Sequence, residues 1–162
     1  MISLKKRAQG FTIVELLIVI VVIGILAGLV ITTYSGVQEN ARNTERQTDL
    51  KAIQGQLEAY YAKNGTYPSA TLVNDDTWRH ANMKGLDDQA LRDPKGAVGS
   101  KLLVDTAASA TQYGYQGWSD SGKTTACTDS GSGDTATSDC LKYTLTAQKE
   151  GSADVISYSS LN

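Results

Sequence analysis

Histidine, cysteine and proline are scarce in this sequence of 162 residues, which contains one His, two Cys and two Pro. With His80 as the single imidazole, a metal site built from several histidines is excluded, and a catalytic triad around histidine has no independent support. The phosphate-binding glycine loop, the dinucleotide fingerprint and the serine-centred elbow of hydrolases are also absent. We therefore expect no catalytic residue, no cofactor and no metal site, and a surface or partly packed position for His80.

Basic residues are concentrated at the start of the chain. Lys5, Lys6 and Arg7 precede the first long apolar run, and removal of residues 1–10 would change the formal net charge from −2 to −5. The body of the protein is therefore mildly acidic. An acidic body argues against nucleic acid as the main partner, because surfaces that bind nucleic acid are normally basic.

Long apolar runs are missing except for residues 11–31, which contain a single charge, Glu15, in 21 positions. As a helix with a rise of about 1.5 Å per residue, this run is roughly 30 Å long, which is the thickness of the bilayer hydrocarbon. The basic residues before the run favour a cytoplasmic N-terminus and place everything after it across the membrane. An ordinary secretory signal is disfavoured, because residues 29–34 match its small-residue cleavage site poorly.

No proline interrupts residues 37–63, and the pattern predicts that the helix continues through them. Apolar residues recur at steps of three and four, at Leu50, Ile53, Leu57 and Tyr60/Tyr61. We expect one helix over about residues 11–63, apolar all round in its first half and amphipathic in its second, with a stop at Asn64-Gly65. The opposite, polar face is expected to carry Arg42, Glu45, Arg46, Asp49, Lys51 and Glu58.

Three stretches in the second half of the chain predict β-strands. They are residues 111–118, 141–148 and 154–159, in which apolar and polar residues alternate, and Gly151-Ser152 supplies a hairpin turn between the last two. A small antiparallel sheet with one apolar face needs a cover, and the apolar stripe of the long helix is the available surface. The fold class predicted is therefore α+β, with a helix laid on a small sheet.

The residues between the helix and the first strand show no clear period. We expect residues 69–110 to form an irregular connector, with a short helix near residues 87–91 and a turn at residues 93–96. Tyr60, Tyr61 and Tyr67 are expected to pack under the sheet, because aromatic packing is a commoner role than a ligand cage.

The two cysteines, Cys127 and Cys140, lie in the same polar stretch. In an exported chain, such a pair predicts a disulfide that closes a loop of 14 residues. Two unrelated reduced thiols are the alternative. Residues 128–139 are almost entirely Gly, Ser, Thr and Asp, so we expect no ordering by burial there, and a disulfide in place of a core. Three loop acids are expected to be solvated, because their spacing is not that of a calcium-binding EF-hand loop: Asp129, Asp134 and Asp139.

The N-terminal residues follow a specific order. A short basic leader ends in Gly10, and Phe11, Glu15 and a long apolar run come after it. In this order the sequence resembles the type IV prepilin family. The resemblance extends from Lys5 to about Pro68, because residues 59–68 also look like the segment that ends the family's long helix; beyond it, only the order of helix before strands matches.

The resemblance implies how the chain is processed. Residues 1–10 would be a leader peptide, removed between Gly10 and Phe11 by a prepilin peptidase, and the new amine of Phe11 would be methylated. Residues 11–36 would form the transmembrane and assembly helix, and residues 37–162 the extracytoplasmic globular pilin domain. The family usually has a proline where Thr32 and Thr33 stand, ahead of which its helix unwinds on assembly, and this sequence departs from that pattern.

Glu15 would be the assembly carboxylate. A carboxylate within an apolar helix costs a few kcal/mol unless it is paired or near the interface. The amine of Phe11, from the same or from a neighbouring subunit, is a suitable partner. The simpler alternative is that Glu15 lies at the membrane interface and is solvated by headgroups. Many pilins also have a disulfide near the C-terminus that bounds a surface loop, and the pair Cys127 and Cys140 resembles it.

We therefore expect a structural subunit of a type IV pilus-like filament. Its partners would be identical subunits in a helical homopolymer, the prepilin peptidase, the inner-membrane assembly machinery and, before assembly, the lipid bilayer; the filament would lie on the cell surface. A secretion or DNA-uptake pseudopilin shares this N-terminus, although the polar disulfide loop favours an exposed pilus. Two alternatives of other classes are a signal-anchored binding domain, not cleaved after Gly10, and a membrane-tethered enzyme using carboxylates.

Overall fold

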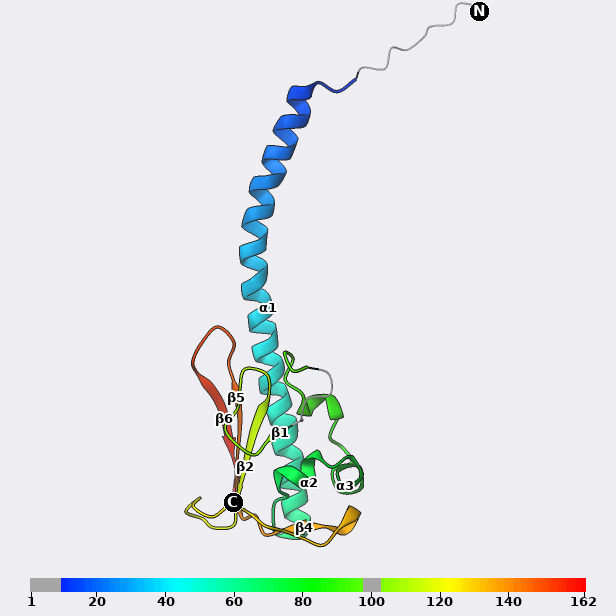
Figure 1. Cartoon of the computed structure of the whole chain (residues 1–162), viewed down its shortest axis with the longest axis vertical. Helices are drawn as coiled ribbons and strands as arrows, with labels where there is room; N and C mark the ends of the chain where they lie inside the picture. Colours follow the sequence, from blue (N-terminus) through cyan, green and yellow to red (C-terminus); the bar gives the residue numbers. More distant parts are fainter. Residues whose placement is uncertain (1–9, 98–102) are drawn as a thin grey trace, which may run out of the picture. The chain divides into compact units, whose positions relative to one another are not determined.

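The computed structural model describes residues 10–97 and 103–162 (Figure 1). The chain divides into two compact units, Met1–Gln38 and Glu39–Asn162. One helix, α1 (Ile13–Asn64), contributes to both. The predicted long helix and the predicted α+β class are therefore confirmed, and the helix ends at the expected Asn64-Gly65, where Gly65 adopts a φ of 78°.

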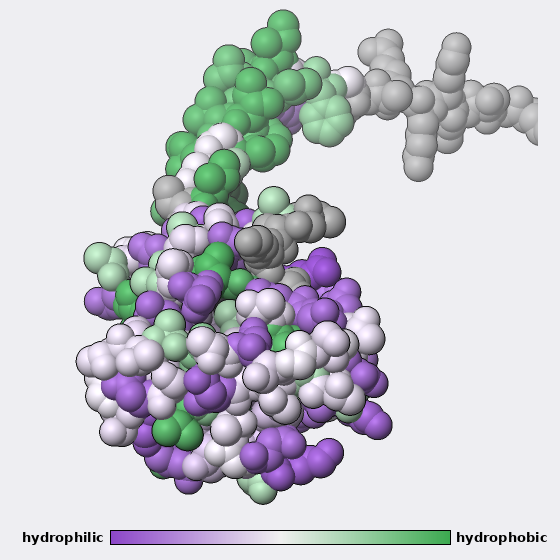
Figure 2. Space-filling view, turned by 60° about the horizontal axis from the view of Figure 1, so that its bottom comes forward, coloured by the Kyte–Doolittle hydropathy of each residue, from purple (hydrophilic) through white to green (hydrophobic). Residues whose placement is uncertain are grey.

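In the first unit, the large apolar side chains of α1 are exposed. Every Val, Leu and Ile of residues 13–31 is at least 48% exposed. Figure 2 shows them as a continuous hydrophobic surface on the helix. By length and composition, this helix is able to cross a membrane.

In the second unit, the same helix packs into a core. Leu50, Ile53 and Leu57 are completely buried, as the spacing predicted. They join one cluster with apolar and aromatic residues of the sheet, including Tyr113, Tyr115, Tyr143 and Leu145. The predicted aromatic packing at the helix end is also present, since the rings of Tyr61 and Tyr67 stack with centroids 4.5 Å apart.

The sheet of the second unit has four strands in the order β1-β2-β5-β6 (Figure 1). The three predicted strands are β2 (Tyr113–Trp118), β5 (Lys142–Gln148) and β6 (Val155–Ser159), and they pair antiparallel as expected. The fourth, β1 (Leu103–Val104), lies parallel to β2. Two residues are too few to show an alternating pattern, so the sequence did not reveal this strand.

The expectation of an irregular connector is wrong for its first part. Two short helices, α2 (Ala70–Asn74) and α3 (Asp76–Asn82), follow α1 directly. Each begins at a side-chain cap: Ser69 accepts a hydrogen bond from the amide of Leu72, and Asp75 accepts one from the amide of Trp78. A 3-10 turn, η1 (Asp88–Leu91), lies close to the predicted short helix. Residues 98–102 of the connector lie outside the described residues.

Residues 128–139 are more ordered than their composition predicted. A disulfide joins Cys127 and Cys140, whose Cα atoms are 5.1 Å apart. Between them, β3 (Asp129–Ser130) pairs with β4 (Thr137–Ser138), and η2 (Gly133–Thr135) forms the tip. Burial does contribute, because Ala136 is buried and its carbonyl accepts a 2.6 Å hydrogen bond from the indole of Trp78. The hairpin is therefore anchored to α3.

The polar face predicted for α1 is wrong at Arg46, which is buried, whereas Asp49 and Glu58 are partly exposed and bind tyrosine hydroxyls. Arg46 is 1% exposed and donates hydrogen bonds of 2.7 and 2.9 Å to the two carboxylate oxygens of Asp93. Asp49 accepts a 2.7 Å bond from Tyr113, and Glu58 accepts 2.9 Å bonds from two further tyrosine hydroxyls. Charged residues here serve as partners for groups that are distant in the sequence, which helical periodicity does not show.

Candidate assembly helix and its first turn

The first turn of α1 contains a reciprocal cap. Thr12 precedes the helix, and its amide and hydroxyl donate hydrogen bonds of 2.9 and 2.8 Å to one carboxylate oxygen, Oε2, of Glu15. The amide of Glu15 in turn donates a 3.2 Å bond to the Thr12 hydroxyl. This arrangement is a capping box, in which the N-cap and the third helical residue satisfy each other's free donors.

The capping box was missed at the level of sequence, although its signal was present. Thr12 and Glu15 stand in the spacing Thr-x-x-Glu directly before the apolar run. The cap turns the Glu15 carboxylate back toward the start of the helix. An acidic group in the first turn also interacts favourably with the positive end of the helix dipole. The geometry therefore gives Glu15 a local function in addition to the predicted one.

The bond predicted to be cleaved lies just outside the helix. Gly10 and Phe11 are exposed and non-helical, and α1 begins two residues later at Ile13. A protease needs its substrate backbone accessible and outside a helix, and this segment meets both conditions. The rest of the predicted leader, residues 1–9, lies outside the described residues.

The other predicted site residues lie in the second unit. The disulfide of Cys127 and Cys140 bounds the β3–β4 hairpin. His80 is on the surface of α3, as predicted, with its Nδ1 atom 2.7 Å from the Asp76 carbonyl. Across residues 10–97 and 103–162, no three side chains of the types that ligate metals come together.

Charged groups near the start of the second unit form a cluster that sequence reasoning also missed. Glu150, in the turn between β5 and β6, accepts bonds of 2.6 Å from both Arg42 and Lys95. The hydrogen bonds from these two residues, Arg42 first, lower the pKa of Glu150 to about 2. Burial instead raises the pKa of Asp49 to about 6, and the hydrogen bond from Tyr113 opposes part of this shift.

Comparison with known proteins gives the N-terminal part of the chain a context. Residues 5–31 match the family described as the prokaryotic N-terminal methylation motif. The chain is 36% identical over 66 residues to type II secretion system core protein G of Dickeya chrysanthemi, a match that covers 41% of this chain and 43% of that protein. The protein of the same name from Aeromonas hydrophila is 37% identical over 78 residues, covering 45% and 54%.

A third relative, core protein G of Klebsiella pneumoniae, is 39% identical over 64 residues, which are 40% of this chain and 46% of that protein. The chain thus spans about half the length of the curated relatives it matches. No solved structure matches the chain significantly. In its N-terminal part, the chain thus carries the prokaryotic N-terminal methylation motif and is similar to the core protein G relatives.

Proposed function

We propose that the chain is a structural subunit of a type IV pilin-like filament, which acts by assembly and not by catalytic turnover. The observation that carries this proposal is the exposed apolar surface of residues 13–31, on a helix that begins with the methylation motif. Burial of apolar surface is worth about 25 cal/mol per Å². A surface of this extent requires a cover outside the chain, supplied by lipid before assembly and by the helices of identical subunits afterwards.

Maturation would follow the predicted route. A prepilin peptidase would cut between Gly10 and Phe11, and the amine of Phe11 would be methylated. Residues 11–36 would then be the membrane and assembly segment, with a cytoplasmic N-terminus, and residues 37–162 the extracytoplasmic globular domain. The inner-membrane assembly machinery would move the subunit from the bilayer into the filament.

Glu15 would guide the register of assembly. A charge in a hydrocarbon environment costs a few kcal/mol, and this cost falls when an opposite charge lies beside it. Cleavage creates such a charge at Phe11, one residue before the cap formed by Thr12. A neighbouring subunit, shifted along the filament, would place its own Phe11 amine at the height of Glu15.

Two destinations for the filament can be told apart. The name of the relatives, type II secretion system core protein G, favours a filament of a secretion system, and this is our first candidate. The β3–β4 hairpin favours a cell-surface pilus, because it presents exposed Ser, Thr and Asp residues on a loop that a disulfide closes. Mechanical shearing of intact cells separates the two, since it releases surface pili and leaves a filament within the envelope.

The proposal is tested by the start of the mature protein. Filament material should begin at a methylated Phe11, as measured by N-terminal sequencing and intact mass. The variant Gly10→Glu should keep its leader and stay in the membrane, because a bulky charge beside the cut bond obstructs the peptidase, whereas Gly10→Ala serves as the mild control. Filaments built from subunits that still begin at Met1 would overturn the proposal.

A further inference from the structure

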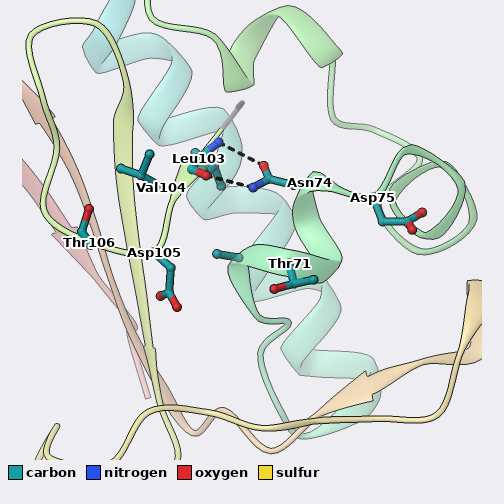
Figure 3. A pocket seen from close by; sticks show the side chains of 8 residues that line it. Thr71, Asn74, Asp75, Leu103, Val104, Asp105 and Thr106 are labelled. Atoms are coloured by element: carbon teal, nitrogen blue, oxygen red, sulfur yellow. Dashed lines mark hydrogen bonds between the residues drawn. The ribbon is translucent and has the colours of Figure 1, made fainter. Parts of the chain in front are cut away.

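A groove of about 650 Å³ lies on the globular unit between α2 and the segment that begins with β1 (Figure 3). Its apolar lining includes Ala70, Leu103 and Val104. Ala70 and Leu103 are themselves buried and belong to the core, so the floor of the groove is rigid. The groove therefore offers a formed apolar surface that nothing in the described chain covers.

Asn74 determines what kind of ligand the groove can take. Its side-chain amide donates a 2.9 Å hydrogen bond to the Leu103 carbonyl, and its side-chain oxygen accepts a 3.0 Å bond from the Leu103 amide (Figure 3). These are the groups with which an added strand would pair. The strand edge is thus already occupied at Leu103, and the groove is suited to side chains in place of an extended backbone.

The charge of the groove is acidic. Asp75 and Asp105 are both exposed and belong to its lining, and none of the described residues that line it is basic (Figure 3). The Asp75 carboxylate accepts a hydrogen bond from the Trp78 amide and points toward the start of α3, which leaves Asp105 as the acid available to a cation in the groove (Figure 3). The groove therefore favours an apolar side chain that is accompanied by a cation.

The globular unit itself carries one surface with this chemistry. Three of its large apolar residues are exposed in the described chain: Leu141 at 44%, Val155 at 54% and Leu161 at 76%. Leu141 is followed directly by Lys142 in the sequence. Beside Val155, Lys149 pairs with Asp154 across the β5–β6 turn, so the cation there is accompanied by an acid, and no cation is a sequence neighbour of Leu161. Leu141 is therefore the exposed apolar residue whose cationic neighbour has no adjacent acid in the sequence, and charge complementarity favours it.

We propose that Leu141 of one copy docks in the groove of a second copy, with Lys142 facing Asp105. The inference rests on the proposed filament function and names one contact between neighbouring globular units. The two surfaces differ, so the contact is heterologous and each copy can use both at once. Contacts of this kind extend into open helical arrays when the rotation does not close a ring.

A photo-cross-linking experiment on assembled filaments tests this contact. Full-length subunits carry p-benzoylphenylalanine at position 141, and light and ¹⁵N-labelled copies are mixed in the same cells. Mass spectrometry should find cross-links from position 141 to residues 70–75 or 103–106 of a differently labelled copy. Cross-links confined to other segments, to the same copy or to an unrelated protein would overturn the proposal.

Charge reversal gives an independent measurement. Asp105→Lys and Lys142→Asp should each reduce filament yield about fivefold through like-charge contact, and the two changes combined should restore most of it. The matched control is Asp134→Lys at the exposed tip of the β3–β4 hairpin, which should assemble normally. If wild-type subunits form no filament, the proposed function fails; if they form filaments and the reversals have no effect, this contact alone is wrong.

Discussion

The two halves of α1 differ in the partners of their side chains. In residues 13–31, every large aliphatic side chain is exposed and the one charge, Glu15, is bound within its own first turn. In the second unit, Leu50, Ile53 and Leu57 are fully buried, and Arg46, one turn before Leu50, reaches across to Asp93. The apolar residues of the second half are buried by the globular unit, whereas those of the first half remain exposed.

The two halves therefore contribute differently to the stability of the protein. The second half is held by tertiary packing, so substitutions there should change the free energy of unfolding of the globular unit. The first half contributes little to that free energy, because its large aliphatic side chains are exposed, and its substitutions should change assembly. Variants in the two halves should therefore separate folding from polymerisation, and a variant that affects both would break the distinction.

The largest effect on folding is expected at the buried ion pair. Arg46→Met leaves the Asp93 carboxylate, 1% exposed at its side chain, without its partner. Such a change typically costs about 3–5 kcal/mol. Chemical denaturation of the full chain in detergent, followed by the fluorescence of buried Trp78, should show this loss. The control is Arg46→Met combined with Asp93→Leu, which removes both charges and should recover most of the stability.

The disulfide should have the next largest effect. Replacement of Cys127 and Cys140 by serine should lower the free energy of unfolding by about 2–4 kcal/mol, because the unfolded chain gains the freedom of an open loop. The same denaturation assay measures this change. Mass analysis of native filaments without reductant should find no free thiol, and two alkylatable cysteines there would contradict the bond.

A smaller, pH-dependent effect is expected at Asp49, whose pKa burial raises from 3.8 to about 6. The folded state then binds this proton more tightly than the unfolded chain does. Its contribution to stability is therefore full below pH 3.8 and lost as the pH rises through 6. Asp49→Asn should stabilise the globular unit by roughly 1–2 kcal/mol at neutral pH and have little effect near pH 4. Equal effects at both pH values would contradict the shift.

Local patterns predicted the helix and the three longer strands, because both have periods that a sequence displays. The same patterns did not predict the partners of Arg46, which is polar by type yet buried, since its counter-ion Asp93 is 47 residues away. The elements α2 and β1 have only five and two residues, which are too few to display a repeating pattern. At the candidate site, the spacing of Thr12 and Glu15 is a capping-box signal that the sequence does display.

The smallest effect on the helix, and the one that separates two roles of Glu15, is expected from Thr12→Ala. This change removes the hydroxyl that takes part in two of the three capping contacts, and loss of an N-cap side chain typically costs about 1 kcal/mol. The globular unit should unfold at the same denaturant concentration as before, because Thr12 lies in the first unit, before the start of α1.

Comparison of Thr12→Ala with Glu15→Ala then decides what the carboxylate does. If capping is its whole function, both variants weaken the same box and should assemble alike. If Glu15 pairs with the Phe11 amine of a neighbour, Thr12→Ala leaves that carboxylate in place, and filaments should form. Glu15→Ala should then show normal membrane levels, normal cleavage at Gly10 and few filaments. Both variants must be expressed without a wild-type copy, and abundant filaments from Glu15→Ala subunits would leave the apolar surface alone to drive assembly.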